Sequence, residues 1–420
     1  MARRYFGTDG VRGVVGVDLT PELVERLGRA AAYWCGGGPI FIGRDTRASG
    51  IELERVLAEG IASAGGNAVV AGVLPTPAVA LLTLDLGCVI TASHNPPEYN
   101  GVKFFDRDGQ KLPDASEEEI EALLERPPVG GGTVDDVGVA TDSYLAHVVE
   151  RFGSDLTGIH VAVDCANGAY SGVAPKAFDQ LGARTTTIGD EPDGNNINVG
   201  CGATDLRALQ ETVPRVQADL GVAFDGDGDR MLAVDARGRP VDGDQIVAIL
   251  ALHKRVEMVA VTSMTNLGFH QLMNERDIRV VTTDVGDRYV LEALRREGGV
   301  LGGEQSGHII YLDGHVTGDG LAAALALCGA LSGRTLEEAA AVMPHYPQAK
   351  ENVVVGRLVL TDAVRGEVER LNAELDGRGR VLVRPSGTEP VIRVLAEAPD
   401  EAEAANLCGT IAALVRRELG

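Results

Sequence analysis

The sequence predicts an α/β protein: three similar α/β domains with mixed, mostly parallel sheets around a central cleft, followed by a smaller α+β domain. Three observations support this fold class. The chain has 420 residues, which is too long for one ordinary core. Apolar runs of four or five residues alternate with helical periodicity, as parallel strands joined by crossover helices do. The same order of strands and helices also occurs three times, although the copies share little residue identity.

Each copy of the repeat has a strand, a helix and two further strands. The expected strands are residues 39–43, 68–72 and 87–91, then 160–164, 185–189 and 220–224, then 258–262, 279–283 and 299–302. The expected helices are residues 52–64, 173–181 and 269–274. The tail has strands at 380–383 and 391–398 and a helix at 400–419. We place the domains at residues 1–140, 141–237, 238–346 and 347–420.

Three unusual polar motifs follow the third strand of their copies. They are TASHNP (residues 91–96), DGDGDR (225–230) and GGEQSGH (302–308). Ligands bind at the carboxyl ends of parallel strands in α/β sheets. We therefore expect the three loops to face one shared cleft.

The composition excludes several classes of function. A formal net charge of -23 argues against binding to nucleic acid and to anionic membrane surfaces. No apolar run approaches the length of a membrane span, and the N-terminus lacks the apolar segment of a secretory signal. The six cysteines are scattered and mostly in apolar contexts, as in a reducing compartment. These features predict a cytoplasmic protein.

The DGDGDR loop predicts a metal site. Glycines between Asp225, Asp227 and Asp229 let three carboxylates turn toward one point, and such crowding is costly without a hard divalent cation. A calcium-binding EF-hand is excluded because Arg230 and Ala236 stand where its Gly and Glu belong. A solvated acidic turn is the alternative, and the strand that runs directly into the loop favours the site.

The RPSGTEP segment has the composition of a phosphate nest. Arg384 supplies a charged fork, Ser386 and Thr388 supply hydroxyls, and Gly387 lets backbone N–H groups turn inward. Arg393 adds a second fork. Alone this motif is weak, since such turns are common in β-hairpins.

Two further glycine-rich loops carry candidate binding groups. Glu304, Ser306 and His308 offer a carboxylate, a hydroxyl and an imidazole, which suit the paired hydrogen bonds of a sugar. A loop with a structural histidine is the alternative. Residues 6–13 carry Arg12, and an exposed N-terminal turn is the alternative there.

Ser93 ends the third strand of the first copy, with His94 beside it and Lys103 downstream. Ser and Asn favour turns, so this motif alone is also consistent with an ordinary turn. A serine hydroxyl is a poor nucleophile without an activating group, and the GxSxG elbow of α/β-hydrolases is absent. With a metal loop and a phosphate nest elsewhere in the chain, we interpret Ser93 as a catalytic residue that carries a phosphoryl group.

With these motifs the chain resembles the α-D-phosphohexomutase superfamily from about Tyr5 to the C-terminus. TASHNP, DGDGDR, GEQSGH and RPSGTEP occur in the order typical of that superfamily. Within it, RYFGTDGVRG, SMTNLG, VGDRYVLE and TGDG most resemble the branch that interconverts glucosamine 6-phosphate and glucosamine 1-phosphate. The segment PPEYNGVKFF instead looks like the branch that acts on mannose and glucose phosphates, and Asp284 stands where several relatives of the glucosamine branch carry Lys.

The resemblance implies a mechanism and roles for the site residues. Ser93 is phosphorylated in the resting enzyme, and one Mg²⁺ per chain is held by that phosphate with Asp225, Asp227 and Asp229. Phospho-Ser93 gives its phosphoryl group to the sugar monophosphate, and the bisphosphorylated sugar returns the other phosphate. The other implied roles are phosphoryl-site groups (His94, Arg12, Arg230), proton transfer (Lys103, His308), sugar binding (Glu304, Ser306) and binding of the non-transferring phosphate (Arg384, Ser386, Gly387, Thr388).

The resemblance also implies a hexose 1,6-bisphosphate activator, a phosphorylated hexose or hexosamine as substrate, and a homodimer as an assembly to test. Two other functions remain open from the residues. A metal-dependent sugar phosphatase with an aspartate nucleophile would want Thr where Asp229 stands. A non-catalytic sugar-phosphate sensor would be expected to have lost the serine or a carboxylate of the metal loop, and this chain retains them all.

Overall fold

The computed structural model describes residues 4–7, 9–386 and 390–420. The chain forms two compact units, which we describe separately. The first contains Met1–Ser263 and Arg279–Ala341, and the second contains Met264–Ile278 and Val342–Gly420. Among the described residues, no helix combines the length and apolar character needed to cross a membrane.

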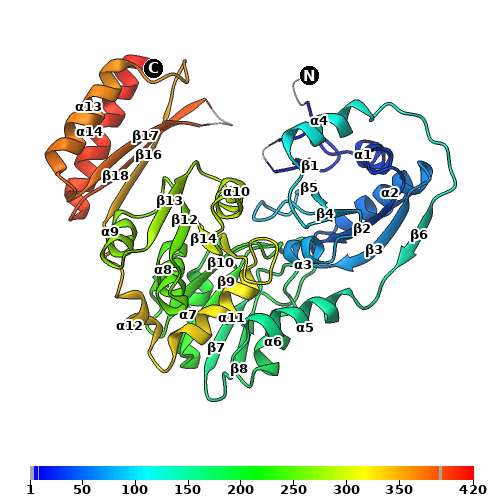
Figure 1. Ribbon diagram of the computed structural model, residues 1–420, viewed down its shortest axis with the longest axis horizontal. Helices are drawn as coiled ribbons and strands as arrows, with labels where there is room; N and C mark the ends of the chain where they lie inside the picture. Colours follow the sequence, from blue (N-terminus) through cyan, green and yellow to red (C-terminus); the bar gives the residue numbers. More distant parts are fainter. Residues whose placement is uncertain (1–3, 8, 387–389) are drawn as a thin grey trace. The chain divides into compact units, whose positions relative to one another are not determined.

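The first unit holds three sheets (Figure 1). The first has the order β1-β5-β4-β2-β3-β6, the second β11-β10-β9-β7-β8 and the third β13-β12-β14-β15. The strands of the first sheet are β1 (Val11–Val14), β2 (Pro39–Arg44), β3 (Asn67–Val73), β4 (Leu86–Ile90), β5 (Tyr99–Asp106) and β6 (Thr133–Asp136). Those of the second are β7 (His160–Asp164), β8 (Arg184–Ile188), β9 (Leu220–Phe224), β10 (Met231–Asp235) and β11 (Pro240–Val241). Those of the third are β12 (Met258–Thr262), β13 (Arg279–Thr283), β14 (Leu301–Gly303) and β15 (Ile309–Tyr311).

The three sheets share one topology, which confirms the predicted repeat. In each, the first strand of the copy lies between the third and the second, and both pairings are parallel: β4-β2-β3, β9-β7-β8 and β14-β12-β13. Each third strand then pairs antiparallel with the strand that follows it, which is β5, β10 or β15. The sheets are thus mixed but mostly parallel, as expected. The three polar motifs occupy the same connection in each sheet, between the third strand and its antiparallel neighbour.

Helices complete the first unit. They are α1 (Pro21–Trp34), α2 (Gly50–Ser63), α3 (Thr76–Leu81), α4 (Asp114–Ala122), α5 (Ala140–Phe152), α6 (Ala174–Gln180), α7 (Arg207–Val216), α8 (Gly243–Lys254), α10 (Asp287–Glu297), α11 (Gly320–Leu331) and α12 (Leu336–Ala340). Helices α1 and α2 pack closely against each other because two glycines at their contact lack side chains. A Cβ at Gly28 would lie 2.3 Å from the Leu57 carbonyl oxygen, and one at Gly60 would lie 2.0 Å from that of Glu25.

The second unit is a small α+β fold, as predicted. Its antiparallel sheet has the order β16-β18-β17, made of β16 (Gln348–Val354), β17 (Arg380–Pro385) and β18 (Val391–Glu397). Its helices are α9 (Leu267–Glu275), α13 (Asp362–Leu375) and α14 (Glu401–Leu419). Val353, Leu371, Ile392 and Ile411 are among the buried residues of its own core. The sequence analysis had expected β17, β18 and α14 but not β16 or α13.

Candidate active site

The three equivalent loops of the first unit meet. Ser93 lies in the loop that follows β4. Its hydroxyl donates a hydrogen bond of 2.7 Å to the carboxylate of Asp225, in the loop that follows β9. Asp229 in turn lies 3.1 Å from Nε2 of His308, before β15. The predicted convergence of TASHNP, DGDGDR and GGEQSGH is therefore present, and Ser93 is only 2% exposed there.

The DGDGDR loop forms a buried triad of carboxylates. The ligand atoms of Asp225, Asp227 and Asp229 lie within 4.8 Å of one another. Burial, together with the charges of Asp229 and Asp227, raises the pKa of Asp225 to about 8. Among the described residues, no hydrogen-bond partner reaches the buried Oδ1 of Asp227. An underpaired carboxylate oxygen in a cluster of hard oxygen donors suits a divalent cation such as Mg²⁺.

Lys103 on β5 provides the central positive charge. Its Nζ lies 3.1 Å from Asp9, 3.2 Å from Asp227 and 3.7 Å from Asp229. Burial alone would lower the pKa of Lys103, but these carboxylates outweigh it and the pKa is raised. A second lysine, Lys111, pairs with Asp9 at 2.9 Å. A small pocket beside them is lined by both lysines, Asp9 and Arg288, among other residues.

Further cations surround the serine. Arg12 on β1 pairs with Asp9, and Nε of Arg230 lies 3.9 Å from Asp225. His94 Nδ1 lies 3.4 Å from the Ser93 hydroxyl. Burial, followed by the charges of Arg230 and Arg12, lowers the pKa of His94 to about 4, so this imidazole is neutral near pH 7. A neutral imidazole thus lies beside the hydroxyl, with the Arg230 guanidinium next to its acceptor Asp225.

The third loop forms a chain of polar contacts. Nδ1 of His308 lies 2.9 Å from Glu304, which also accepts a hydrogen bond from the backbone N–H of Gly286 at 3.0 Å. Burial and Arg230 oppose protonation of His308, but Asp229 and Glu304 prevail and raise its pKa to about 10. Ser306 is exposed, with its hydroxyl 3.5 Å from Glu304. The loop therefore presents one accessible hydroxyl beside a buried, already paired carboxylate.

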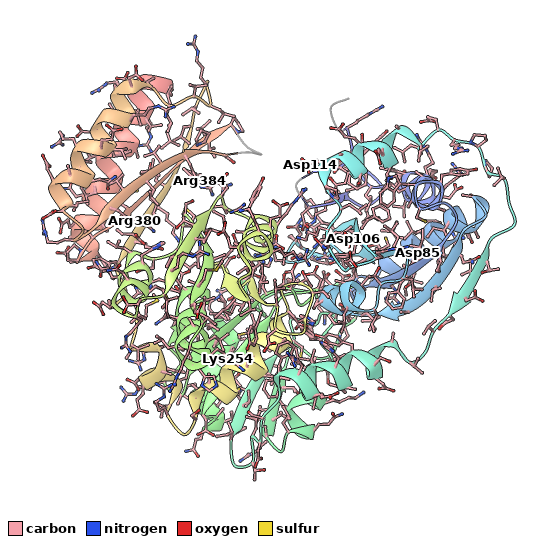
Figure 2. The ribbon with its side chains drawn as sticks, in the orientation of Figure 1. Asp85, Asp106, Asp114, Lys254, Arg380 and Arg384 are labelled. Carbon is pink, nitrogen blue, oxygen red and sulfur yellow. The ribbon has the colours of Figure 1, made fainter. Side chains whose placement is uncertain are left out.

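The predicted phosphate nest lies in the second unit. Figure 2 shows Arg380 and Arg384, both of which belong to β17. Arg384 pairs in register with Arg393 on β18, and Arg393 donates to the Ser386 hydroxyl at 3.4 Å. Gly387 and Thr388 lie outside the described residues.

Several residues of the site were missed by the sequence analysis. Asp45 and Arg47 form a fully buried ion pair beneath the Ser93 loop, at 2.9 Å. Thr76, at the start of α3, donates its hydroxyl to Asp227 at 2.7 Å, and the Asn198 amide reaches the Ser93 carbonyl at 2.9 Å. A signal for Arg47 did exist: the charged run Arg44–Arg47 follows β2, whose carboxyl end lies beside that of β4.

The sequence allows two interpretations of Asp284: a surface residue, or a partner for the amine of a glucosamine phosphate. Its side chain is exposed at the end of β13, and its backbone carbonyl accepts a hydrogen bond from Thr283 at 2.8 Å. These contacts favour the surface interpretation.

Comparison with known protein families agrees with this geometry. Four family profiles of phosphoglucomutase/phosphomannomutase match along the chain. These are alpha/beta/alpha domain I at residues 3–128, domain II at 142–238, domain III at 242–346 and the C-terminal domain at 347–414.

Curated relatives match over nearly the full length. A protein of Moorella thermoacetica is 49% identical, covering 96% of this chain and 97% of its own length, and one of Bacillus licheniformis is 45% identical, covering 99% of both. Both are named phosphoglucosamine mutase.

Solved structures confirm the fold. A phosphoglucomutase/phosphomannomutase family protein from Burkholderia thailandensis superimposes with a TM-score of 0.85 at 24% identity, covering 99% of this chain and 98% of its own. The N-acetylphosphoglucosamine mutase of Aspergillus fumigatus, solved with GlcNAc-6P and magnesium, gives a TM-score of 0.72 at 19% identity, covering 99% and 96%. The chain belongs to the phosphoglucomutase/phosphomannomutase family of phosphohexomutases, in the branch whose curated members are named phosphoglucosamine mutase.

Proposed function

We propose that this enzyme interconverts glucosamine 6-phosphate and glucosamine 1-phosphate through a phosphorylated Ser93 and a bisphosphorylated sugar. The observation that carries the proposal is the Ser93 hydroxyl, held 2.7 Å from Asp225 at the edge of a buried carboxylate triad. Phosphoryl transfer needs positioning and charge neutralisation more than elaborate covalent chemistry. Full-length relatives named phosphoglucosamine mutase support the choice of sugar.

A single Mg²⁺ fits the donor set. Asp225, Asp227 and Asp229 supply hard oxygen ligands, and the buried Oδ1 of Asp227 has no other partner among the described residues. When bound, the ion would neutralise charge on the phosphoryl group at Ser93, which would be a further ligand. The lysine and arginines nearby add to that neutralisation without taking the place of the ion.

The chain's own residues then have distinct tasks. Arg12 and Arg230 supply guanidiniums that stabilise the transferring phosphoryl group, and neutral His94 donates or accepts a hydrogen bond beside it. When the Oγ–P bond of phospho-Ser93 breaks, the serine oxygen needs a proton, and the attacking sugar hydroxyl must lose one. Lys103 and His308 are held as cations by neighbouring carboxylates, so either can protonate the leaving serine oxygen. The residue that has given up its proton then takes the proton that the attacking sugar hydroxyl loses, so the net transfer is from the sugar hydroxyl to Ser93.

Substrate binding falls to two loops. We assign the sugar hydroxyls to Glu304 and Ser306, and the phosphate that is not transferring to Arg384, Ser386 and Arg393 with Gly387 and Thr388. The sugar must present either of its two ends to Ser93. Separate loops for the hydroxyls and for the non-transferring phosphate allow both orientations. A hexose 1,6-bisphosphate would keep Ser93 phosphorylated, and we expect a cytoplasmic enzyme with a homodimer as the assembly to test.

The test combines a phosphorylation assay with a comparison of sugars. Incubation with glucose 1,6-bisphosphate should add one phosphoryl group to the intact mass, mapped to Ser93. A coupled assay with glucosamine 6-phosphate should show turnover that EDTA abolishes and Mg²⁺ restores. A partly desolvated charged hydrogen bond to the C2 ammonium predicts a roughly 10- to 100-fold higher kcat/KM than for glucose 6-phosphate. Full activity in Ser93→Ala would refute the phosphoserine mechanism, and equal or better turnover of glucose or mannose phosphates would refute the choice of sugar.

A further inference from the structure

We propose that Arg47 is a positioning residue for phosphoryl transfer: it fixes the strained backbone of Ser93 so that the hydroxyl stays directed at Asp225. The inference rests on the proposed role of Ser93 and adds a residue that does not itself touch the transferring group. It is carried by backbone geometry, burial and a closed set of hydrogen bonds.

The backbone of Ser93 is held in a costly conformation. Its φ is 52°, in the left-handed region that L-residues other than Gly, Asn and Asp rarely adopt. Such outliers persist only where the surrounding structure enforces them. The left-handed turn is what reverses the chain after β4, so the direction of the hydroxyl depends on it. Something must therefore hold Ser93 there.

Arg47 has the contacts to do so. Its guanidinium is completely buried and donates to four backbone carbonyls of the phosphoserine loop. Nη2 reaches Ser93 at 2.9 Å and Asn95 at 2.8 Å, while Nη1 reaches Tyr99 at 3.0 Å and also Pro96. One rigid, planar cation thus fixes the whole loop from Ser93 to the start of β5. Because every acceptor in the serine loop is a backbone atom, the role concerns the conformation of the loop, not recognition of a particular side chain in it.

The amide of Ser93 is tied to the same cation. Its N–H donates to the Thr91 hydroxyl at 2.8 Å, and that hydroxyl donates to Asp45 at 2.7 Å. Asp45 pairs with Nε of Arg47 at 2.9 Å. The contacts therefore form a closed ring that runs from the Ser93 N–H through Thr91, Asp45 and Arg47 to the Ser93 carbonyl. Both ends of the residue are fixed to one buried ion pair, which determines the backbone on either side of the hydroxyl-bearing carbon.

The fixed carbonyl also sets the loop against the carboxylate triad. Asn198, from the second sheet's part of the unit, donates to the same Ser93 carbonyl at 2.9 Å. Gly226 packs so closely that a Cβ there would lie 2.8 Å from this oxygen. The oxygen that Arg47 holds is thus the point where the serine loop rests on the DGDGDR loop. A shift of this oxygen would displace the hydroxyl from Asp225.

Misplacement of a reacting group by about 1 Å can cost about 100-fold in rate. Lysine cannot reproduce the planar fork of arginine, so even Arg47→Lys should release part of the loop. The matched control is Arg44→Lys, at the end of β2, where Arg44 pairs with Glu54 at 3.1 Å and donates to the backbone carbonyl of Asp45 at 3.2 Å. Both changes keep the charge and alter a largely buried arginine, but only the first touches the serine loop.

The full-length Arg47→Lys, Arg47→Gln and Arg44→Lys enzymes would be compared with wild type for kcat and KM with glucosamine 6-phosphate, Mg²⁺ affinity by calorimetry, and melting temperature. We expect kcat to fall about 100-fold in the Arg47 variants. KM and Mg²⁺ affinity should change less than threefold, because the sugar-binding loops and the carboxylates are intact. Arg44→Lys should keep kcat within threefold at a comparable loss of melting temperature. Should Arg47→Gln not fold, Arg47→Lys and Thr91→Val, which cuts the other arm of the chain of contacts, carry the test.

The crystal structure of Arg47→Lys provides a readout independent of activity. Ser93 should leave the left-handed region, or its hydroxyl should move out of hydrogen-bond range of Asp225. Wild-type kcat in Arg47→Lys, or an unmoved Ser93, would overturn the inference. A wild-type enzyme without mutase activity would overturn the proposed function instead, and the variant's crystal structure would still decide the role of Arg47.

Discussion

Two buried aspartates of the first unit, Asp225 and Asp319, have opposite chemistry. The pKa of Asp225 is raised to about 8 by burial and by its neighbours Asp229 and Asp227. Burial also opposes ionisation of Asp319, yet its partners lower the pKa below the ordinary range. Both side chains are buried, and they lie close to the same loop. Each oxygen of Asp225 also has a partner, since Oδ2 accepts from the Ser93 hydroxyl and Oδ1 accepts from the backbone N–H groups of Gly228 and Arg230. The difference is in the charge of the neighbouring side chains.

Asp319 precedes α11 and has a partner for each oxygen. Oδ1 accepts from the Tyr170 hydroxyl at 2.8 Å and from the backbone N–H of Ala322 at 2.9 Å, which caps the helix. Oδ2 accepts from Tyr144 at 2.8 Å and lies 3.0 Å from Nε2 of His315. This carboxylate is complete without any ligand. Asp225 instead has two like-charged aspartates beside it. The charge of the neighbouring side chains, rather than burial, therefore separates the site from its scaffold.

The largest effect should come from the triad. In Asp227→Asn, we expect kcat to fall at least about 1000-fold, because a metal ligand and part of the charge on it are lost. Stability in EDTA should change by less than about 1 kcal/mol, since one repulsive carboxylate is removed while Lys103 keeps Asp9 and Asp229. Steady-state kinetics and urea unfolding give the two values. A large loss of stability with little loss of kcat would reverse the comparison.

For Asp319 the expected pattern is the opposite. Asp319→Asn should lower the free energy of unfolding by about 3 kcal/mol, because a paired, buried charge is replaced by an amide that cannot satisfy all four partners. Its kcat at 25 °C should stay within about tenfold of wild type, since the residue lies behind the site. Urea unfolding and the same kinetic assay test both values. If Asp319→Asn lost activity as strongly as Asp227→Asn, the charge of the neighbouring side chains would not distinguish site from scaffold.

His270, on α9 of the second unit, is a buried histidine next to a positive charge and outside the candidate active site. Its Nε2 is buried without a hydrogen-bond partner among the described residues. Burial and the charge of Arg380 lower its pKa to about 4. The unfolded chain, with the ordinary pKa of 6.5, therefore binds the proton first, and stability falls as pH drops from about 7 toward 4. Between pH 7 and 5 we expect a loss of about 1–2 kcal/mol from this group. Denaturant unfolding of wild type and His270→Leu at both pH values should show a smaller loss in the variant.

The smallest effect should come from one tyrosine of the scaffold. Tyr144→Phe removes one donor to Asp319, while Tyr170, the helix N–H and His315 remain. We expect a loss of about 1 kcal/mol, the usual net value of one buried hydrogen bond, and unchanged kcat. Val148→Ala, on the same helix and also buried, is the control for a change in packing alone. A loss above about 3 kcal/mol for Tyr144→Phe would show that the hydroxyl network acts as a unit.

The sequence predicted the repeated strands best where they are short apolar runs buried in the sheet, as β4, β7, β9 and β12 are. It did not predict β5, which is antiparallel and carries the buried Lys103 among aromatic and polar residues. The tail was predicted in part, since the first five residues of β16 are mostly polar and half-buried or exposed, and only Val353 near its end is buried. Strand propensity alone could not recover such segments, because their burial depends on partners far along the chain.

The carboxylate triad and Ser93 could be expected from local chemistry, as unusual polar residues directly after buried strands. Thr76 and Asn198 could not, because their importance comes from contacts with residues 151 and 105 positions away. Arg47 had a local signal in the charged run at the end of β2, but its contact with Ser93, 46 positions away, gives it its role. Asn198 also lies in a long segment without regular structure, between β8 and α7. Their side chains are ordinary; only the fold gives them a role.

Three repeats of one fold could have been independent modules, but here each repeat has charged side chains whose partners lie in another repeat. Thr76 and Lys103, in the repeat of the first sheet, donate hydrogen bonds to Asp227, in the repeat of the second sheet. His308 of the third serves Asp229 of the second, and Lys111 of the first pairs with Asp287 of the third at 2.8 Å. A chain divided between repeats would expose uncompensated charges on both sides of the cut. If a single repeat were exchanged between relatives, the incoming repeat would therefore need matching residues at these contacts. The three copies are thus expected to change together in evolution.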